Sequence, residues 1–200
     1  MIKRAIKCQP PQTGGDKNYF LKLAKTRKTT YEFSDKKIKE SDIKNILEAA
    51  RWAPSCSNSQ PWHFVVVENA DRISKLMRGV YYGGFHEDPP LMIAIVLGSG
   101  CWKDNKHICG KNKNSVLIDT YESIAMAALN MVYEAQALGI DSCLLTPSQK
   151  VVSEILKIKK PDVCPLMVGF GYEKNGAFQK KRERHPLNRL VSYEYMRGKK

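Results

Sequence analysis

The sequence predicts one compact domain in which α-helices and β-strands are mixed. The chain has 200 residues with a hydrophobic share of 42%, which suits a single domain that buries a substantial core. Apolar residues repeat at helical spacing in several segments, of which 116–138 is the longest, whereas 91–97 and 165–172 are mostly apolar runs typical of buried strands. The order of helices and strands by itself leaves a doubly wound sheet and an α+β arrangement open.

Residues 1–16 are expected to form an N-terminal arm, because they hold two prolines, two glycines and no apolar periodicity. Residues 17–200 are expected to form the domain itself. Its first helix is expected over 18–25. In the next helix, Ser41 and Asp42 stand where their side chains can accept hydrogen bonds from first-turn amides, and a later proline should end the helix.

The remaining elements are predicted in the same way. A strand is expected over 63–67, and Asp71 can cap a helix over 72–78. Gly139 is a natural terminator of the long helix, because glycine readily adopts the left-handed conformation that ends helices. A last helix is expected over 148–157, ahead of the second buried strand.

The net charge of +13 indicates a surface that attracts phosphate groups, nucleic acids or acidic membranes. A nucleic-acid-binding protein is therefore one alternative, but the sequence has no zinc-finger, RNP-type or helix-turn-helix pattern. No apolar run reaches the length that crosses a bilayer, and the six cysteines lack the spacing of a disulfide framework. We expect a cytoplasmic protein with reduced cysteines that binds neither nucleic acid nor membrane.

Two segments, 81–90 and 98–115, show the least periodicity. Three residues of the second segment could ligate zinc, but two of them are separated by a single residue and no fourth ligand lies near; they are Cys101, His107 and Cys109. A substrate lid without metal is the favoured interpretation. The aromatic side chains that could contact a planar substrate are Tyr81, Tyr82, Phe85 and Trp102.

The most distinctive stretch lies between two prolines and holds five short polar side chains and one cysteine. As a bare pattern it is a solvated connector. The sequence Ala-Pro-Ser-Cys-Ser-Asn-Ser-Gln-Pro-Trp, preceded by Leu-Glu-Ala-Ala-Arg, resembles the signature of the nitroreductase family of flavin enzymes. The resemblance implies that this loop contacts the flavin through Pro54, Ser55, Cys56 and Asn58, with Cys56 in place of a serine.

Two basic segments carry further parts of the resemblance. Arg27-Lys28-Thr29, aligned on Phe33, is similar to a family segment that binds the flavin phosphate and ribityl chain, although Tyr31 stands where the family often has a basic residue. The segment 180–187 resembles the family's Lys-x-Arg-x-Pro-Leu, which implies that Arg182 and Arg184 join Arg27 on the phosphate. Guanidinium and ammonium groups suit this role because they form charge-assisted hydrogen bonds.

The segment that follows the long helix completes the implied site. Gly139-Ile140-Asp141-Ser142-Cys143 resembles the family's Gly-x-x-Ser-Cys strand, whose end lies beside the flavin ring. The backbone N–H groups of Leu145 or Thr146 are therefore candidates for hydrogen bonds near flavin N5. No catalytic side chain is implied, because the flavin carries the redox chemistry.

The resemblance implies a three-layer α+β fold, with a mainly antiparallel sheet flanked by helices and two chains intertwined as a homodimer through the long helix. It implies FMN as cofactor and a ping-pong cycle in which NADH or NADPH reduces the flavin and a small planar acceptor, such as a nitroaromatic or a quinone, takes the electrons. The alternative within the family is a specialised flavin enzyme, reductive dehalogenase-like or flavin-processing. Residues 188–200 are expected to wrap around the partner subunit, because five apolar side chains there are too many to leave in water.

Overall fold

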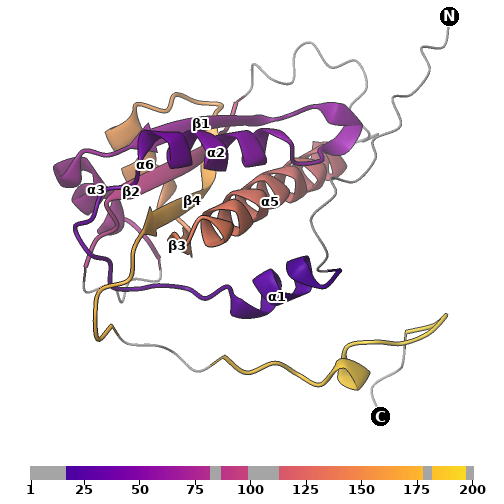
Figure 1. Cartoon of the computed structure of the whole chain (residues 1–200). Coiled ribbons are helices and arrows are strands. Elements are labelled where there is room, and N and C mark those ends of the chain that lie inside the picture. The colour runs from indigo at the N-terminus through magenta and orange to yellow at the C-terminus, as the bar shows by residue number, and fades with distance from the viewer. Residues whose placement is uncertain (1–16, 82–86, 99–112, 178–181, 197–200) are drawn as a thin grey trace, which may run out of the picture.

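The computed structural model describes residues 17–81, 87–98, 113–177 and 182–196. They build one antiparallel sheet of four strands in the order β1-β2-β4-β3 (Figure 1). The strands are β1 (Trp62–Val67), β2 (Leu91–Leu97), β3 (Asp141–Leu145) and β4 (Val163–Gly171). Every neighbouring pair runs antiparallel. The doubly wound alternative is therefore excluded, and the predicted α+β fold with a mainly antiparallel sheet is confirmed.

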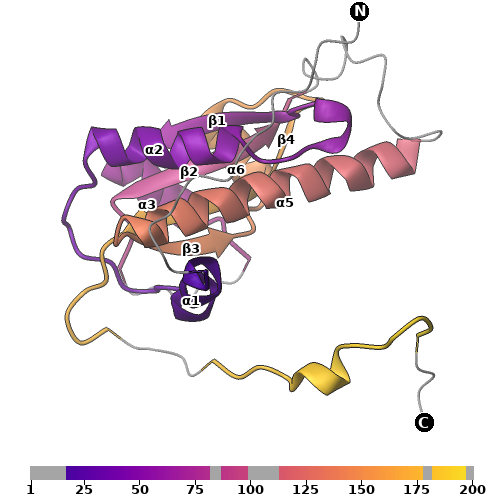
Figure 2. The same cartoon turned by 45° about the vertical axis from the view of Figure 1, so that its right-hand side comes forward.

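Helices cover both faces of the sheet and make three layers (Figure 2). α2 (Glu40–Arg51) and α5 (Lys113–Ala137) lie on one face, and α3 (Ala70–Met77) and α6 (Gln149–Leu156) lie on the other. In β2, Ile93 and Ile95 belong to the core shared with α2 and α5, whereas Met92 and Ala94 belong to the core shared with α3 and α6. Because β2 is buried on both faces, its sequence is apolar throughout rather than alternating.

Two predicted helix caps are wrong. α2 begins directly after Lys39, whose side chain makes no cap hydrogen bond, so Ser41 and Asp42 lie inside the first turn. α3 is capped by Asn69, whose side chain accepts a backbone hydrogen bond at 2.9 Å, and Asp71 lies inside the helix. In both helices the acidic residues of the first turn still stabilise the positive end of the helix dipole.

β4 begins earlier than predicted and contains Pro165. Proline lacks an N–H group and is normally confined to sheet edges, strand starts or bulges. The pairing of β4 with β2 shifts register between Ile95 and Leu97, and the regular pairing with β3 ends at Met167. Pro165 therefore lies where the ladder is irregular on one side and has ended on the other, which explains how a central strand tolerates it.

α5 is the longest described helix and ends close to its predicted terminator. Gly139 has a φ of 72°, the left-handed conformation expected of a residue that follows a helix. One face of α5 is buried in the core, while the other carries exposed apolar side chains: Leu117, Ile118, Tyr121, Met126 and Leu129. Within the described ranges, no helix combines the length and the apolar character needed to cross a membrane.

The buried Cys164 thiol should make the fold sensitive to alkaline pH. Loss of solvation raises the pKa of this thiol from 9.0 to about 12. As the pH rises, the Cys164 thiol ionises in the unfolded chain before it ionises in the folded chain. The stability that the buried neutral thiol contributes is therefore complete below the unfolded pKa and is lost as the pH rises through the folded pKa. Between about pH 8 and about pH 10, the wild-type free energy of unfolding should fall by about 1 kcal/mol more than that of Cys164→Ala. Urea unfolding at both pH values measures this, and equal falls would contradict it.

Candidate functional site

The loop between α2 and β1 is held in strained backbone conformations. Ser57, Asn58 and Gln60 have φ values of 52°, 55° and 47°, in the left-handed region that residues other than glycine rarely adopt. Each such residue costs on the order of 1–3 kcal/mol, and strain of this kind clusters at ligand-binding and catalytic sites. The backbone N–H of Gln60 donates to Ser55 Oγ at 3.0 Å and holds the turn closed.

The same loop is anchored to the N-terminal half of α5. The backbone N–H of Cys56 donates to Ser123 Oγ at 3.4 Å, and the Cys56 thiol donates to Asp119 Oδ2 at 3.5 Å. Ser123 is buried, and its hydroxyl donates to the Asp119 carbonyl at 2.7 Å. Sequence reasoning missed these two anchors, although a serine on the buried face of an otherwise apolar helix was an available signal.

The basic segment that follows α1 (Tyr19–Thr26) runs along the start of β3. Thr29 forms a parallel bridge with Ser142, whose carbonyl accepts a hydrogen bond from the Thr30 N–H at 3.2 Å. The half-buried Arg27 guanidinium donates to the Lys28 carbonyl at 2.8 Å and to Thr29 Oγ1 at 3.4 Å. The guanidinium and the hydroxyl predicted to bind phosphate therefore lie side by side.

One residue of the C-terminal basic segment, Arg182, approaches the end of α1. Arg182 Nη2 donates to the Lys25 carbonyl at 2.8 Å, two residues before Arg27. Arg184 is exposed, and its Nη1 donates to the Glu183 carbonyl at 2.9 Å. Among the described residues, these three guanidinium groups donate to carbonyl and hydroxyl oxygens and form no ion pair with a carboxylate. Such uncompensated donors fit a phosphate dianion.

Lys28 differs from its neighbours because it already has acidic partners. Its ammonium nitrogen lies 2.5 Å from Glu173 Oε2 and 3.8 Å from Asp141 Oδ1. Asp141 is the first residue of β3, and Glu173 follows β4. No sequence pattern indicated this pairing, since Glu173 is separated from Lys28 by most of the chain.

Predicted residues also meet at the far end of β3. Leu145 is buried and Thr146 is exposed. The backbone N–H of Tyr81 donates to the Thr146 carbonyl at 3.1 Å, and the Tyr81 side chain is 66% exposed. A predicted substrate contact thus lies beside the predicted ring-binding amides. The other predicted lid residues and zinc ligands lie outside the described residues: Tyr82, Phe85, Cys101, Trp102, His107 and Cys109.

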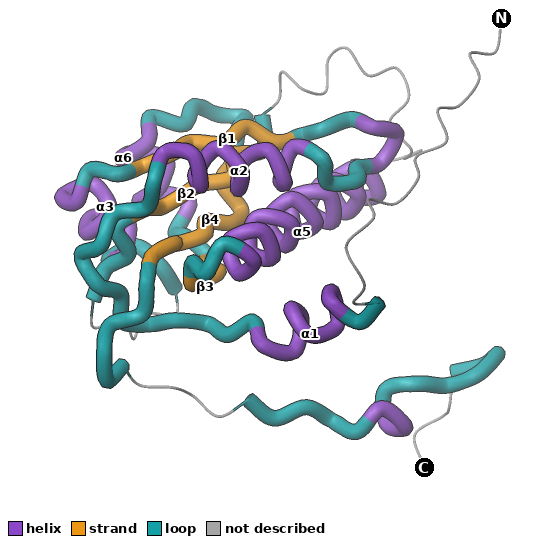
Figure 3. Tube along the Cα trace, in the orientation of Figure 1, coloured by secondary structure: helices purple, strands orange, loops and turns teal. Residues whose placement is uncertain are grey.

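Within one chain, the strained loop and the Arg27 segment lie at opposite ends of α5 (Figure 3). The loop is bonded to Ser123, whereas the Arg27 segment pairs with β3, which starts just after the helix. From Ser123 to its end at Ala137, the helix rises by about 21 Å. The loop also leads into β1, and β1 and β3 are the two opposite edges of the sheet. One chain therefore does not bring these two sets of residues together.

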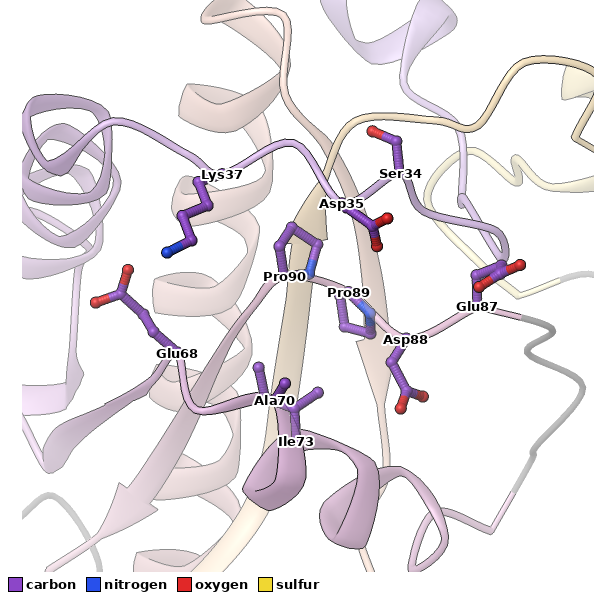
Figure 4. Close-up of a pocket in the computed structure, with 10 residues that line it drawn as sticks. All are labelled: Ser34, Asp35, Lys37, Glu68, Ala70, Ile73, Glu87, Asp88, Pro89 and Pro90. Atoms are coloured by element: carbon purple, nitrogen blue, oxygen red, sulfur yellow. The ribbon is translucent and has the colours of Figure 1, made fainter.

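A separate cavity of about 400 Å³ opens beside α3 and the start of β2 (Figure 4). None of the predicted cofactor residues lines it. Its charged lining consists of four carboxylates and one ammonium group: Asp35, Glu68, Glu87, Asp88 and Lys37. Because an acidic lining repels a phosphate, this cavity is not the candidate cofactor site.

Comparison with known proteins agrees with the motifs. Residues 24–90 match the model described as Nitroreductase family. An Archaeoglobus fulgidus protein named "Putative NADH dehydrogenase/NAD(P)H nitroreductase" is 32% identical over 162 residues, which cover 78% of this chain and 86% of the relative. An oxygen-insensitive NADPH nitroreductase of Helicobacter acinonychis is 24% identical over 196 residues, which cover 82% of this chain and 88% of the relative.

Solved structures share the fold. The chain superposes on the Streptococcus pneumoniae nitroreductase family protein with a TM-score of 0.73 at 23% identity, covering 88% of this chain and 100% of the other. A Desulfovibrio desulfuricans protein crystallised in complex with FMN gives a TM-score of 0.72 at 21% identity, covering 91% of this chain and 100% of the other. The architecture is therefore the three-layer α+β fold of these proteins. The chain belongs to the nitroreductase family.

Proposed function

We propose that this protein is an FMN-dependent oxidoreductase that passes electrons from NAD(P)H to a small planar acceptor such as a nitroaromatic or a quinone. The observation that carries the proposal is that Arg27, beside the start of β3, and Arg182, which donates to the Lys25 carbonyl, have no acidic partner within the described part of the chain. Family membership and relatives named as NAD(P)H nitroreductases support the same reaction class.

The residues of the chain would hold the cofactor along β3. Arg27, Arg182 and Arg184 would bind the phosphate through charge-assisted hydrogen bonds, and the Thr29 hydroxyl would add a further donor. At the other end of the strand, the N–H groups of Leu145 or Thr146 would face the ring, and Tyr81, whose N–H donates to the Thr146 carbonyl, would contact the substrate. When bound, FMN supplies ping-pong redox chemistry, taking electrons from the nicotinamide and giving them to the acceptor.

We further propose that each site is built by two copies of the chain. The loop residues Pro54, Ser55, Cys56 and Asn58 then approach the flavin that is bound by the Arg27 segment of the partner subunit. The exposed apolar face of α5 favours contact with a second copy of the chain, because apolar side chains such as Ile118, which is 58% exposed, would be buried there. The tail after η2 (Leu187–Arg189) would wrap around that copy, because its apolar side chains, including Met196 at 92% exposure, gain by burial there.

The proposal is tested by purifying the protein and recording its absorption spectrum. The protein should be yellow, or should become so when titrated with FMN, and should release FMN on denaturation. Stopped-flow mixing with NADH and NADPH should bleach the flavin, and a panel of nitroaromatics and quinones should restore the colour. Colourless protein that FMN does not reconstitute would contradict the proposal. We also propose a cytoplasmic location, where the buried Cys143 and Cys164 stay reduced.

A further inference from the structure

Lys28 lies where three segments of the chain meet. Its ammonium nitrogen is 2.5 Å from Glu173 Oε2, just past the end of β4, and 3.8 Å from Asp141 Oδ1, at the start of β3. The two acidic residues are also linked to each other, because the Glu173 N–H donates to Asp141 Oδ2 at 2.9 Å. One side chain of the segment after α1 is thereby tied to the ends of both strands.

Backbone contacts surround this ion-pair group and depend on the same alignment. The Thr30 N–H donates to the Ser142 carbonyl at 3.2 Å, and the Lys174 N–H donates to the Glu32 carbonyl at 3.0 Å. Arg27 and Thr29, which flank Lys28, are the groups proposed to bind phosphate. The ion pairs of Lys28 thus act on the same short segment that carries these groups beside β3.

Charge balance separates Lys28 from the three guanidinium groups. Two carboxylates face one ammonium, so the group formed by Lys28, Asp141 and Glu173 presents no excess positive charge to an anion. Glu173 Oε1 is buried and has no hydrogen-bond partner in the described part of the chain. Without Lys28, two neighbouring and partly buried carboxylates would lose their counter-ion, which is far less favourable than losing an exposed pair.

We propose that Lys28 is a positioning residue and not a phosphate ligand: paired with Asp141 and Glu173, it locks the segment that carries Arg27 and Thr29 onto the start of β3. This inference rests on the proposed FMN site. It predicts that the acidic partners matter for FMN binding even though their charge repels phosphate. A phosphate ligand would behave in the opposite way, because removal of a nearby carboxylate would free it and strengthen binding.

The test compares FMN dissociation constants, measured by equilibrium titration of flavin-free protein. Lys28→Met and Glu173→Gln should both weaken FMN binding, by about twofold to tenfold. The matched control is Lys174→Met. Lys174 directly follows Glu173 in the sequence, so this substitution also removes one positive charge close to the ion-pair group. Lys174 pairs with Glu87 across half-exposed side chains, and its loss should change the constant by less than about twofold.

Charge reversal gives the sharper test. Lys28→Glu alone should weaken binding strongly, and the combination of Lys28→Glu with Glu173→Lys should recover most of the loss, because the lock re-forms with its charges exchanged. If Lys28 contacts phosphate, the combined variant should bind no better than Lys28→Glu. Either that result or tighter FMN binding by Glu173→Gln would overturn the proposal.

Hydrogen exchange in the flavin-free protein tests, independently of FMN, whether the ion pairs of Lys28 with Asp141 and Glu173 hold the segment on β3. The Thr30 amide should exchange faster in Lys28→Met and in Glu173→Gln, while amides of β2 keep their protection. Unchanged Thr30 exchange in both variants would overturn the lock even if FMN binding changes. If the wild type binds no FMN, the proposed function fails and the assigned role fails with it, whereas the exchange data still show whether the ion-pair lock exists.

Discussion

Replacing Arg27 with alanine is expected to weaken FMN binding by about tenfold to a hundredfold while the fold is retained. A hydrogen bond to a charged group is worth about 1.5–3 kcal/mol. The Arg27 guanidinium is half-buried and its hydrogen bonds within the described part of the chain go to the Lys28 carbonyl and the Thr29 hydroxyl. Its positive charge is therefore available to a phosphate, and the substitution removes that charge without leaving a carboxylate unpaired.

The measurement is an equilibrium titration of flavin-free protein with FMN and, separately, with riboflavin. Riboflavin lacks the phosphate, so Arg27→Ala should change its dissociation constant far less than that of FMN. Arg51→Ala is the matched control, because the Arg51 guanidinium is paired with Glu48 at 2.5 Å on the exposed side of α2. An unchanged FMN constant for Arg27→Ala, or an equal loss for both flavins, would place Arg27 away from the phosphate.

The sequence predicted the helices and strands well, because most of them have one clear apolar period. β2 could be predicted as fully buried, since no polar residue interrupts 91–97. The order of the strands could not be predicted, because no local sequence pattern indicates which strands are neighbours in the sheet. β4 lies between β2 and β3. The caps of α2 and α3 were misplaced because Ser41, Asp42 and Asp71 are as suitable inside a first turn as before it.

The candidate site shows the same limit. The short motifs drew attention to the strained loop and to the basic segments, because local sequence carries the residue types that those roles need. Contacts between segments that are far apart in the sequence cannot be predicted from local patterns. Examples are the anchoring of Cys56 by Ser123, the approach of Arg182 to Lys25, and the pairing of Lys28 with Glu173. The separation of the loop from the Arg27 segment along α5 likewise required the fold.

That separation leads to the second large effect, which concerns two inactive variants refolded together. Asn58→Ala alters the strained loop, and Arg27→Ala alters the segment at the other end of α5 that is proposed to bind the phosphate. Each variant alone should have little activity at an FMN concentration that just saturates the wild type. Unfolded together in equal amounts and refolded, they should recover about a quarter of wild-type activity by the symmetry of a two-fold dimer.

The recovery follows from the way a shared site combines the two chains. In a mixed dimer, one site receives the altered loop and the altered Arg27 segment, whereas the other receives an intact copy of each. Random pairing makes about half of the dimers mixed, and each mixed dimer has one intact site of two. If each site were built by a single chain, every site in the mixed dimer would keep one defect.

Different affinity tags on the two variants allow the mixed dimers to be purified and assayed, and the variants mixed without unfolding serve as the control. Tagged mixed dimers that stay as inactive as either variant alone would show that Asn58 and Arg27 do not serve one flavin from opposite chains.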